Sequence, residues 1–115
     1  MGVGDIDWPH TVSNEAEGMI HEIALLRIRP GQTAEFEVAF AGAQRIIAGM
    51  NGYLRHELQR CLEDDHKYAL LVWWERLEDH TEGFRGSPEY GEWRSLLHHF
   101  YDPFPTVEHY VRVLP

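Results

Sequence analysis

His80 and Arg85 are the residues of this chain whose types and spacing most readily support catalysis, and both fall within residues 68–90, YALLVWWERLEDHTEGFRGSPEY. A histidine titrates near neutral pH, so His80 is the candidate general base for a phenolic proton. An arginine can hold a carboxylate or stabilise a phenolate oxygen, which makes Arg85 the second catalytic candidate. The alternative for His80 is a solvent-facing or structural residue, and for Arg85 it is an ion pair with one of three nearby acids: Glu78, Glu82 or Glu89.

Aromatic residues around this segment could form a wall for a flat ligand. Trp74 and Phe84 are the candidates, together with His109 near the end of the chain. Neighbouring strand residues point to opposite faces, so only one of Trp73 and Trp74 can line a given pocket. The sequence leaves open which one does, and it also allows His109 to be a buried histidine with a structural hydrogen bond.

Hydrophobic periodicity predicts the elements that must position these residues. Four strands are expected at residues 20–29, 53–62, 66–76 and 106–113, and a helix at 33–50. After the third strand, one helical piece begins at Asp79, whose carboxylate could cap it, and a second begins at Ser87-Pro88. This β-α-β-β-α-β order predicts an α+β, ferredoxin-like fold, in which both helices cover one face of an antiparallel sheet.

By alternation, the opposite face of that sheet would carry four apolar residues, Ile23, Leu25, Leu71 and Trp73, or their neighbours if the register shifts. An exposed apolar face of this kind indicates a partner surface. The simplest partner is a second copy related by a two-fold axis, so we expect a homodimer. Glu22 interrupts the apolar pattern on the helix-covered face of the first strand.

Composition excludes several classes of protein. The net charge of −9 opposes binding to nucleic acid, and no apolar run is long enough to cross a membrane. Cys61 is the single cysteine, and residues 1–18 lack the features of a signal peptide, so a cytoplasmic protein is expected. These residues form an N-terminal extension, and residues 19–115 form one domain. No clustered ligand set or glycine-rich phosphate loop appears, so neither a metal nor a cofactor is expected.

Four stretches of the chain resemble the antibiotic biosynthesis monooxygenase-like family. They are Arg29-Pro30-Gly31, Trp74-Glu75, the run ERLEDHTEGFRGSPEYGEWRSLL and the run PFPTVEHY. The resemblance covers about residues 20–113 and implies a dimeric α+β barrel, with a pocket between sheet and helices in each subunit. In this family some members oxidise polycyclic phenols or quinols without a cofactor, others degrade haem, and others isomerise or bind small signals.

The haem-degrading members resemble this chain at Trp74 but differ from it at two other positions. Their asparagine on the first strand aligns near Ala24, and their histidine on the second helix aligns near Arg94. Many other members have a histidine where this chain has Phe84. The resemblance therefore favours a cofactor-independent monooxygenase acting on a small aromatic molecule. The alternatives are a binding module without turnover and a stress-related protein whose pocket is filled by its own side chains.

Overall fold

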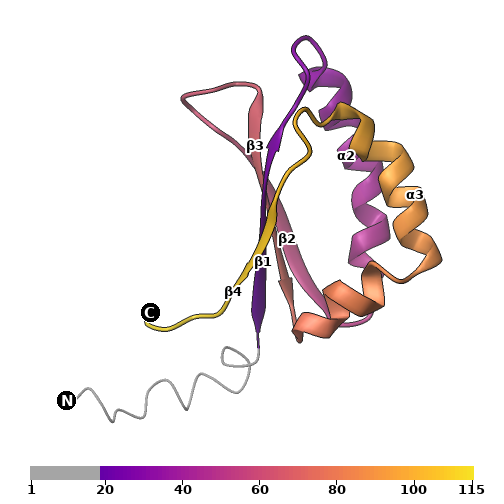
Figure 1. Ribbon diagram of the computed structural model, residues 1–115, viewed down its shortest axis with the longest axis vertical. Coiled ribbons are helices and arrows are strands. Elements are labelled where there is room, and N and C mark those ends of the chain that lie inside the picture. The colour runs from indigo at the N-terminus through magenta and orange to yellow at the C-terminus, as the bar shows by residue number, and fades with distance from the viewer. Residues whose placement is uncertain (1–18) are drawn as a thin grey trace.

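The computed structural model describes residues 19–115, so the expected N-terminal extension lies outside the described residues. The elements follow the predicted order: β1 (Ile20–Arg27), α2 (Thr33–Ala48), β2 (Tyr53–Arg60), β3 (Lys67–Trp74), η1 (Asp79–Phe84), α3 (Pro88–Leu97), η2 (His98–Phe100) and β4 (Val107–Tyr110) (Figure 1). The strands pair antiparallel in the order β2-β3-β1-β4. The predicted ferredoxin-like α+β fold is confirmed.

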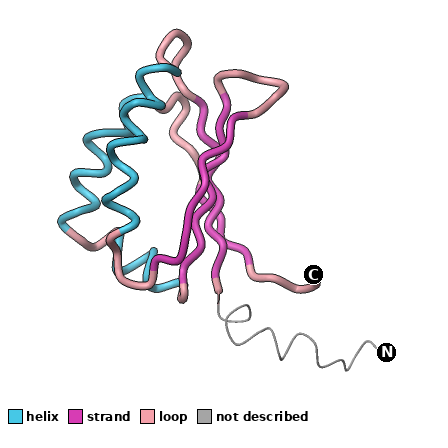
Figure 2. The backbone as a smooth tube through the Cα atoms, turned by 180° about the vertical axis from the view of Figure 1, so that it is seen from behind, coloured by secondary structure: helices cyan, strands magenta, loops and turns pink. Residues whose placement is uncertain are grey.

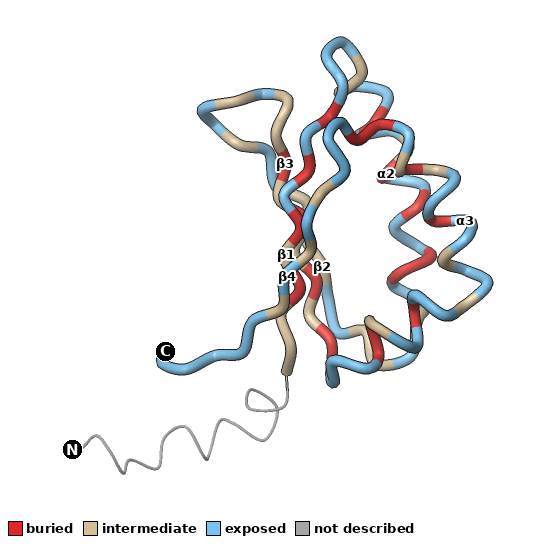
Figure 3. The backbone as a smooth tube through the Cα atoms, in the orientation of Figure 1, coloured by how far each residue is buried: buried red, intermediate tan, exposed pale blue. Residues whose placement is uncertain are grey.

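Both long helices lie on one side of the sheet, and the other side is left uncovered (Figures 1 and 2). Alternation along the strands therefore produces one buried face and one partly exposed face. On β1 the buried face includes Ala24, Leu26 and Ile28, whereas Leu25 is 51% exposed. The buried residues of the sheet and of the helices face each other across the space between the two layers (Figure 3).

The segment after β3 differs from the expectation in one respect. Residues Asp79–Phe84 form a π-helix, and no side chain caps it. The Asp79 carboxylate instead accepts hydrogen bonds from the backbone N–H and the guanidinium of Arg76, both at 3.1 Å. The wider turn is closed by the bond from the Arg85 N–H to the His80 carbonyl at 3.1 Å. Short π-helical segments are frequent at functional sites; this one contains His80 and is followed directly by Arg85, the two predicted catalytic residues.

The helix that follows begins as predicted. The Ser87 hydroxyl accepts a hydrogen bond from the Tyr90 N–H at 3.2 Å, and Pro88 occupies the first helical position. This cap fixes the direction of α3. It places Tyr90, Trp93 and Leu97 on the side that faces the sheet.

We expect Gly52→Ala to destabilise the turn that supports η1. Gly52 has a φ of +83°, and a Cβ at this position would overlap the Asp79 carboxylate. The left-handed conformation alone costs a non-glycine residue about 1–2 kcal/mol, and the overlap adds to that cost. Thermal unfolding of Gly52→Ala beside Gly91→Ala, where a Cβ meets nothing within 4 Å, measures the effect. Equal unfolding midpoints for the two variants would contradict it.

Candidate functional site

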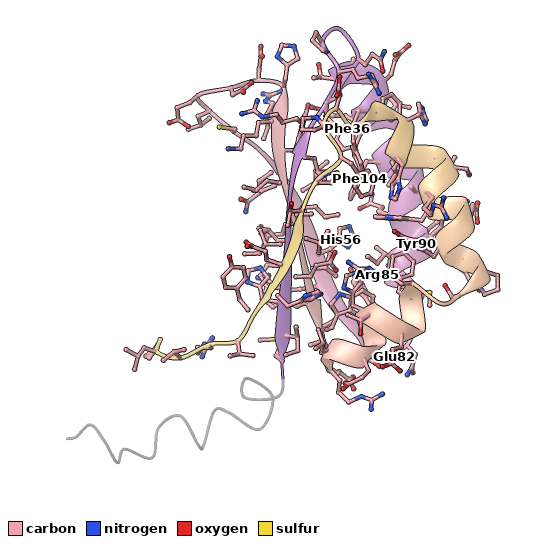
Figure 4. The ribbon with its side chains drawn as sticks, in the orientation of Figure 1. Phe36, His56, Glu82, Arg85, Tyr90 and Phe104 are labelled. Carbon is pink, nitrogen blue, oxygen red and sulfur yellow. The ribbon has the colours of Figure 1, made fainter. Side chains whose placement is uncertain are left out.

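A cavity of about 430 Å³ lies between the helix-covered face of the sheet and the segments η1, α3 and 101–107. This volume falls within the range of small-molecule sites. Figure 4 shows Arg85 and Tyr90 on its helical side and Phe104 further along the sheet. The walls are mostly apolar or aromatic, with few polar groups. The lining residues used below are Glu22, His80, Phe84, Arg85, Tyr90, Trp93, His98 and Tyr101.

Glu22 is the buried acid of this cavity. It comes from β1, is 5% exposed and occupies an inward position between apolar neighbours. The Trp74 indole N–H donates to its Oε1 at 2.9 Å, and its Oε2 lies 3.5 Å from Nε2 of His80. The Trp74 ring also stacks on His80, with the ring centroids 5.5 Å apart. Trp74 thus fixes one carboxylate oxygen and leaves the other facing the imidazole.

His80 lies between the Glu22 carboxyl and His109, which is on the edge strand β4. Its Nδ1 lies 2.8 Å from Nε2 of His109, so one of these nitrogens donates a proton and the other accepts it. His109 reaches this position because it pairs directly with Glu22 across β1 and β4. His80 is 3% exposed, whereas His109 is half-buried on an edge strand. A series of polar contacts therefore runs from Trp74 and Glu22 through His80 to His109, with hydrogen bonds at its two ends and a 3.5 Å contact between Glu22 and His80.

Burial shifts the pKa values of Glu22 and His80 in the direction that favours their uncharged forms. Burial raises the pKa of the Glu22 carboxyl to about 7, although the Trp74 hydrogen bond and the Arg85 charge oppose this change. Burial lowers the pKa of the His80 imidazole to about 3, with smaller contributions from Arg85 and His109. A carboxyl group of this kind gains and loses a proton near neutral pH. The imidazole stays neutral there and is a weak proton acceptor.

Arg85 is an exposed residue that lines the cavity, and its positive charge lowers the pKa values of Glu22, His80 and His109. Its guanidinium makes no ion pair or side-chain hydrogen bond within residues 19–115, so the three acids considered from the sequence do not hold it. An arginine with free N–H donors at a cavity margin can bind an anionic oxygen of a ligand.

Three of the five residues predicted from the sequence, His80, Phe84 and Arg85, line the cavity. Trp74 and His109 do not line it. They lie behind the wall, where they contact Glu22 and His80. Trp73 is on the opposite face of the sheet, where it stacks on His21 at 4.3 Å between centroids.

Glu22 and Tyr101 are cavity residues that were not predicted from the sequence. The available signal for Glu22 was that it is the one acid at an inward position of the first strand. Tyr101 gave no signal in the sequence, because the bend of the chain after η2 is what places it in the cavity.

One cluster of possible metal ligands occurs in the described part of the chain, contrary to the expectation of none. It consists of Asp64, Asp65 and His66 in the turn between β2 and β3. Asp64 already accepts a hydrogen bond from the His66 N–H at 3.0 Å and one from Arg27 at 2.7 Å. These bonds account for the arrangement of the turn.

None of the helices described in residues 19–115 combines the length and the apolar character that a membrane crossing requires.

Comparison with known proteins identifies relatives of this chain. The family model for antibiotic biosynthesis monooxygenase matches residues 19–96. Uncharacterized protein YczJ of Bacillus subtilis is 62% identical over 92 residues, which is 80% of this chain and 97% of that protein.

Solved structures show the same fold. A Bordetella bronchiseptica protein assigned to the antibiotic biosynthesis monooxygenases superimposes with a TM-score of 0.81 and 36% identity, over 84% of this chain and 99% of that one. SnoaB of Streptomyces nogalater, a cofactor-independent oxygenase, superimposes with a TM-score of 0.67 and 21% identity, over 85% and 94% of the two chains. At that identity the SnoaB match shows the fold alone.

Proposed function

Because the chain belongs to the antibiotic biosynthesis monooxygenase family, we propose that it oxidises a flat phenol or hydroquinone with molecular oxygen and without a cofactor. The observation that carries this proposal is the buried Glu22 carboxyl, which lines an aromatic-walled cavity and has a pKa of about 7. A group with this pKa can take a phenolic proton and return it at neutral pH. SnoaB, which has the same fold, is a cofactor-independent oxygenase.

The proposed reaction begins with transfer of the phenolic proton to Glu22, while Arg85 stabilises the phenolate oxygen. The electron-rich phenolate then reduces oxygen in two one-electron steps, and a ring carbon that carries hydrogen forms a C–O bond to give a peroxide. Glu22 returns its proton to the peroxide. The O–O bond then breaks, and the ring hydrogen leaves as a proton with the departing hydroxide. The balance is one phenol and one O₂ to one quinone and one water.

We place the accepted proton on Glu22 rather than on His80, which was the base expected from the sequence. The lowered pKa of His80 makes its imidazole too weak a base to hold a phenolic proton. His80 instead contacts Glu22 Oε2 and positions it toward the cavity, at a distance of 3.5 Å. Phe84 and Trp93 lie nearby on the cavity wall, where their rings would hold a flat substrate.

Oxygen consumption by the purified, cofactor-free protein tests the proposal against a panel of hydroquinones and polycyclic phenols. Uptake that depends on the protein, with one quinone formed per O₂ consumed, is the expected result. Quenching of tryptophan fluorescence by the same compounds without oxygen uptake would replace the proposal by a binding module. The open cavity argues against the third reading, a pocket filled by its own side chains.

We also propose that two copies of the chain associate through the uncovered face of the sheet. Leu25 and Tyr110 on this face are 51% and 48% exposed, beside Ile23, Leu71 and Trp73. The face also carries the ion pair Arg55–Glu57 at 3.4 Å, so a second copy would meet both charge signs. A two-fold contact of this kind is self-complementary.

We expect Leu71→Glu to convert the dimer to a monomer. Leu71 lies in the middle of β3 on the uncovered face, and a carboxylate there would be desolvated opposite its own copy. Light scattering at micromolar concentration measures the mass of each protein. Val38→Glu is the matched control, because Val38 is 75% exposed on α2. A monomeric mass for the unaltered protein would contradict the dimer.

A further inference from the structure

Tyr101 lines the cavity, and its hydroxyl group has no hydrogen-bond partner among residues 19–115. The residue as a whole is 6% exposed. The hydroxyl oxygen is accessible rather than enclosed in the core, so a ligand or water in the cavity can reach it. Burial and the nearby Tyr90 and Glu22 raise the pKa of Tyr101, which keeps the hydroxyl protonated and able to donate.

Tyr101 enters the cavity from the end opposite to Glu22. Its backbone pairs with Ile28, just beyond the end of β1 and six residues from Glu22, which is about 20 Å of extended chain. Its ring packs against Phe36 and Phe104, and Figure 4 shows these two residues above Arg85. The Tyr101 side chain extends from that end into the cavity, near enough to Glu22 for the Glu22 charge to raise the pKa of its hydroxyl, so both groups face one shared space beside Ala24 and Leu26.

His98 adds a second polar side chain near Tyr101. Their ring centroids are 5.4 Å apart, and His98 also lines the cavity. The His98 ring makes no side-chain hydrogen bond in the part of the chain that the structure describes. Burial, with the charge of Arg94, lowers the pKa of His98, so its ring is neutral near pH 7 and offers one donor and one acceptor.

We propose that Tyr101 and His98 form a second polar subsite, which binds an oxygen substituent on the ring of the ligand remote from the hydroxyl that Glu22 deprotonates. The ligand class is then a fused aromatic phenol that carries a carbonyl, ether or hydroxyl oxygen on a ring other than the reacting one. This deepens the proposed function and relies on it for the orientation of the phenol. A phenol without the second oxygen would leave the Tyr101 hydroxyl unpaired and bind more weakly.

Three related probes isolate this hydrogen bond: 1-naphthol, 5-methoxy-1-naphthol and 5-ethyl-1-naphthol. The methoxy and ethyl groups have similar size, but only the methoxy oxygen accepts a hydrogen bond. Titrations without oxygen, followed by quenching of tryptophan fluorescence, give the dissociation constants; Trp93 on the cavity wall is a suitable reporter. We expect the methoxy probe to bind about 2- to 10-fold more tightly than the ethyl probe, the range of one hydrogen bond.

Tyr101→Phe should abolish this preference, whereas Tyr110→Phe should retain it, because Tyr110 lies on the uncovered face and donates to Glu108. His98→Leu should reduce the preference. A wild-type protein that binds both probes equally, or a preference that survives in Tyr101→Phe, would overturn the subsite. Because binding is measured without oxygen, these outcomes do not depend on whether the protein turns the phenol over.

Thermal unfolding of Tyr101→Phe separates the subsite from a structural role. The substitution removes one hydroxyl that has no partner in residues 19–115, so the unfolding midpoint should stay the same or rise. A lower midpoint would mean that the hydroxyl stabilises the fold, and this would also overturn the proposal.

Discussion

Glu22→Gln should lower the rate of phenol oxidation by about 10²- to 10⁴-fold, the usual contribution of a positioned general base. The amide is close in size to the carboxyl group, and its oxygen can still accept the Trp74 N–H, which now lies 2.9 Å from Oε1. It cannot take a proton from the substrate. The loss should therefore appear in kcat more than in KM, because the cavity keeps its shape.

The pH dependence of the unaltered protein provides a second readout. Glu22 accepts a proton only as a carboxylate, so kcat/KM should rise with pH through an apparent pKa of about 7. Glu108→Gln is the control, because Glu108 is exposed on β4 and faces away from the cavity. Undiminished turnover in Glu22→Gln, or a rate that falls as pH rises through 7, would contradict the assignment of Glu22 as the base.

The second prediction with a large expected effect concerns the stability of the fold. Glu22 and His80 should change the pH dependence of the free energy of unfolding in opposite directions. The pKa of Glu22 is raised from its usual 4.5 to about 7 in the folded protein. Its stabilising contribution is complete below pH 4.5 and is lost as pH rises through about 7. The pKa of His80 is lowered from 6.5 to about 3. Its contribution is complete above pH 6.5 and is lost as pH falls toward 3.

These two dependences oppose each other between pH 4.5 and 6.5, so only variants separate them. The free energy of unfolding of Glu22→Gln, relative to the unaltered protein, should increase by about 3 kcal/mol from pH 4.5 to 7, at about 1.4 kcal/mol per pH unit. His80→Gln should instead gain relative stability as pH falls from 6.5 toward 3. Urea unfolding at a series of pH values measures both differences. Parallel curves for the three proteins would mean that neither group changes its pKa on folding.

Much of the fold follows from local sequence features. Alternating apolar residues predicted each strand within about three residues of its observed ends, and Ser87-Pro88 predicted the start of α3. The segment at Asp79 was less predictable, because its π-helical form depends on where its side chains are accommodated. Asp79 bonds to Arg76, and His80 is buried against Trp74. The Asp79–Arg76 contact is local, between residues three apart, whereas the contact of His80 with Trp74 depends on how the segment packs back against β3.

The candidate site was only partly predictable for a similar reason. Proximity to a strand end and to the Ser-Pro cap pointed to His80, Phe84 and Arg85, and all three line the cavity. Trp74 was expected to line the pocket as part of an aromatic wall. It lies behind the cavity wall instead, as a result of the antiparallel pairing of β1 with β3 and β4. The pairing puts Glu22 opposite His109 and brings the Trp74 indole onto the Glu22 carboxyl.

The sequence by itself determined the fold class and the order of the elements, because these depend on hydrophobic periodicity and on residues that begin and end helices. Tertiary structure alone decided the chemistry of the site. A glutamate becomes a proton acceptor with a pKa of about 7 only when burial removes its water. Likewise, the Tyr101 hydroxyl faces the cavity only because the chain after η2 returns to pair with β1. Both results depend on residues far apart in the chain, which no local pattern brings together.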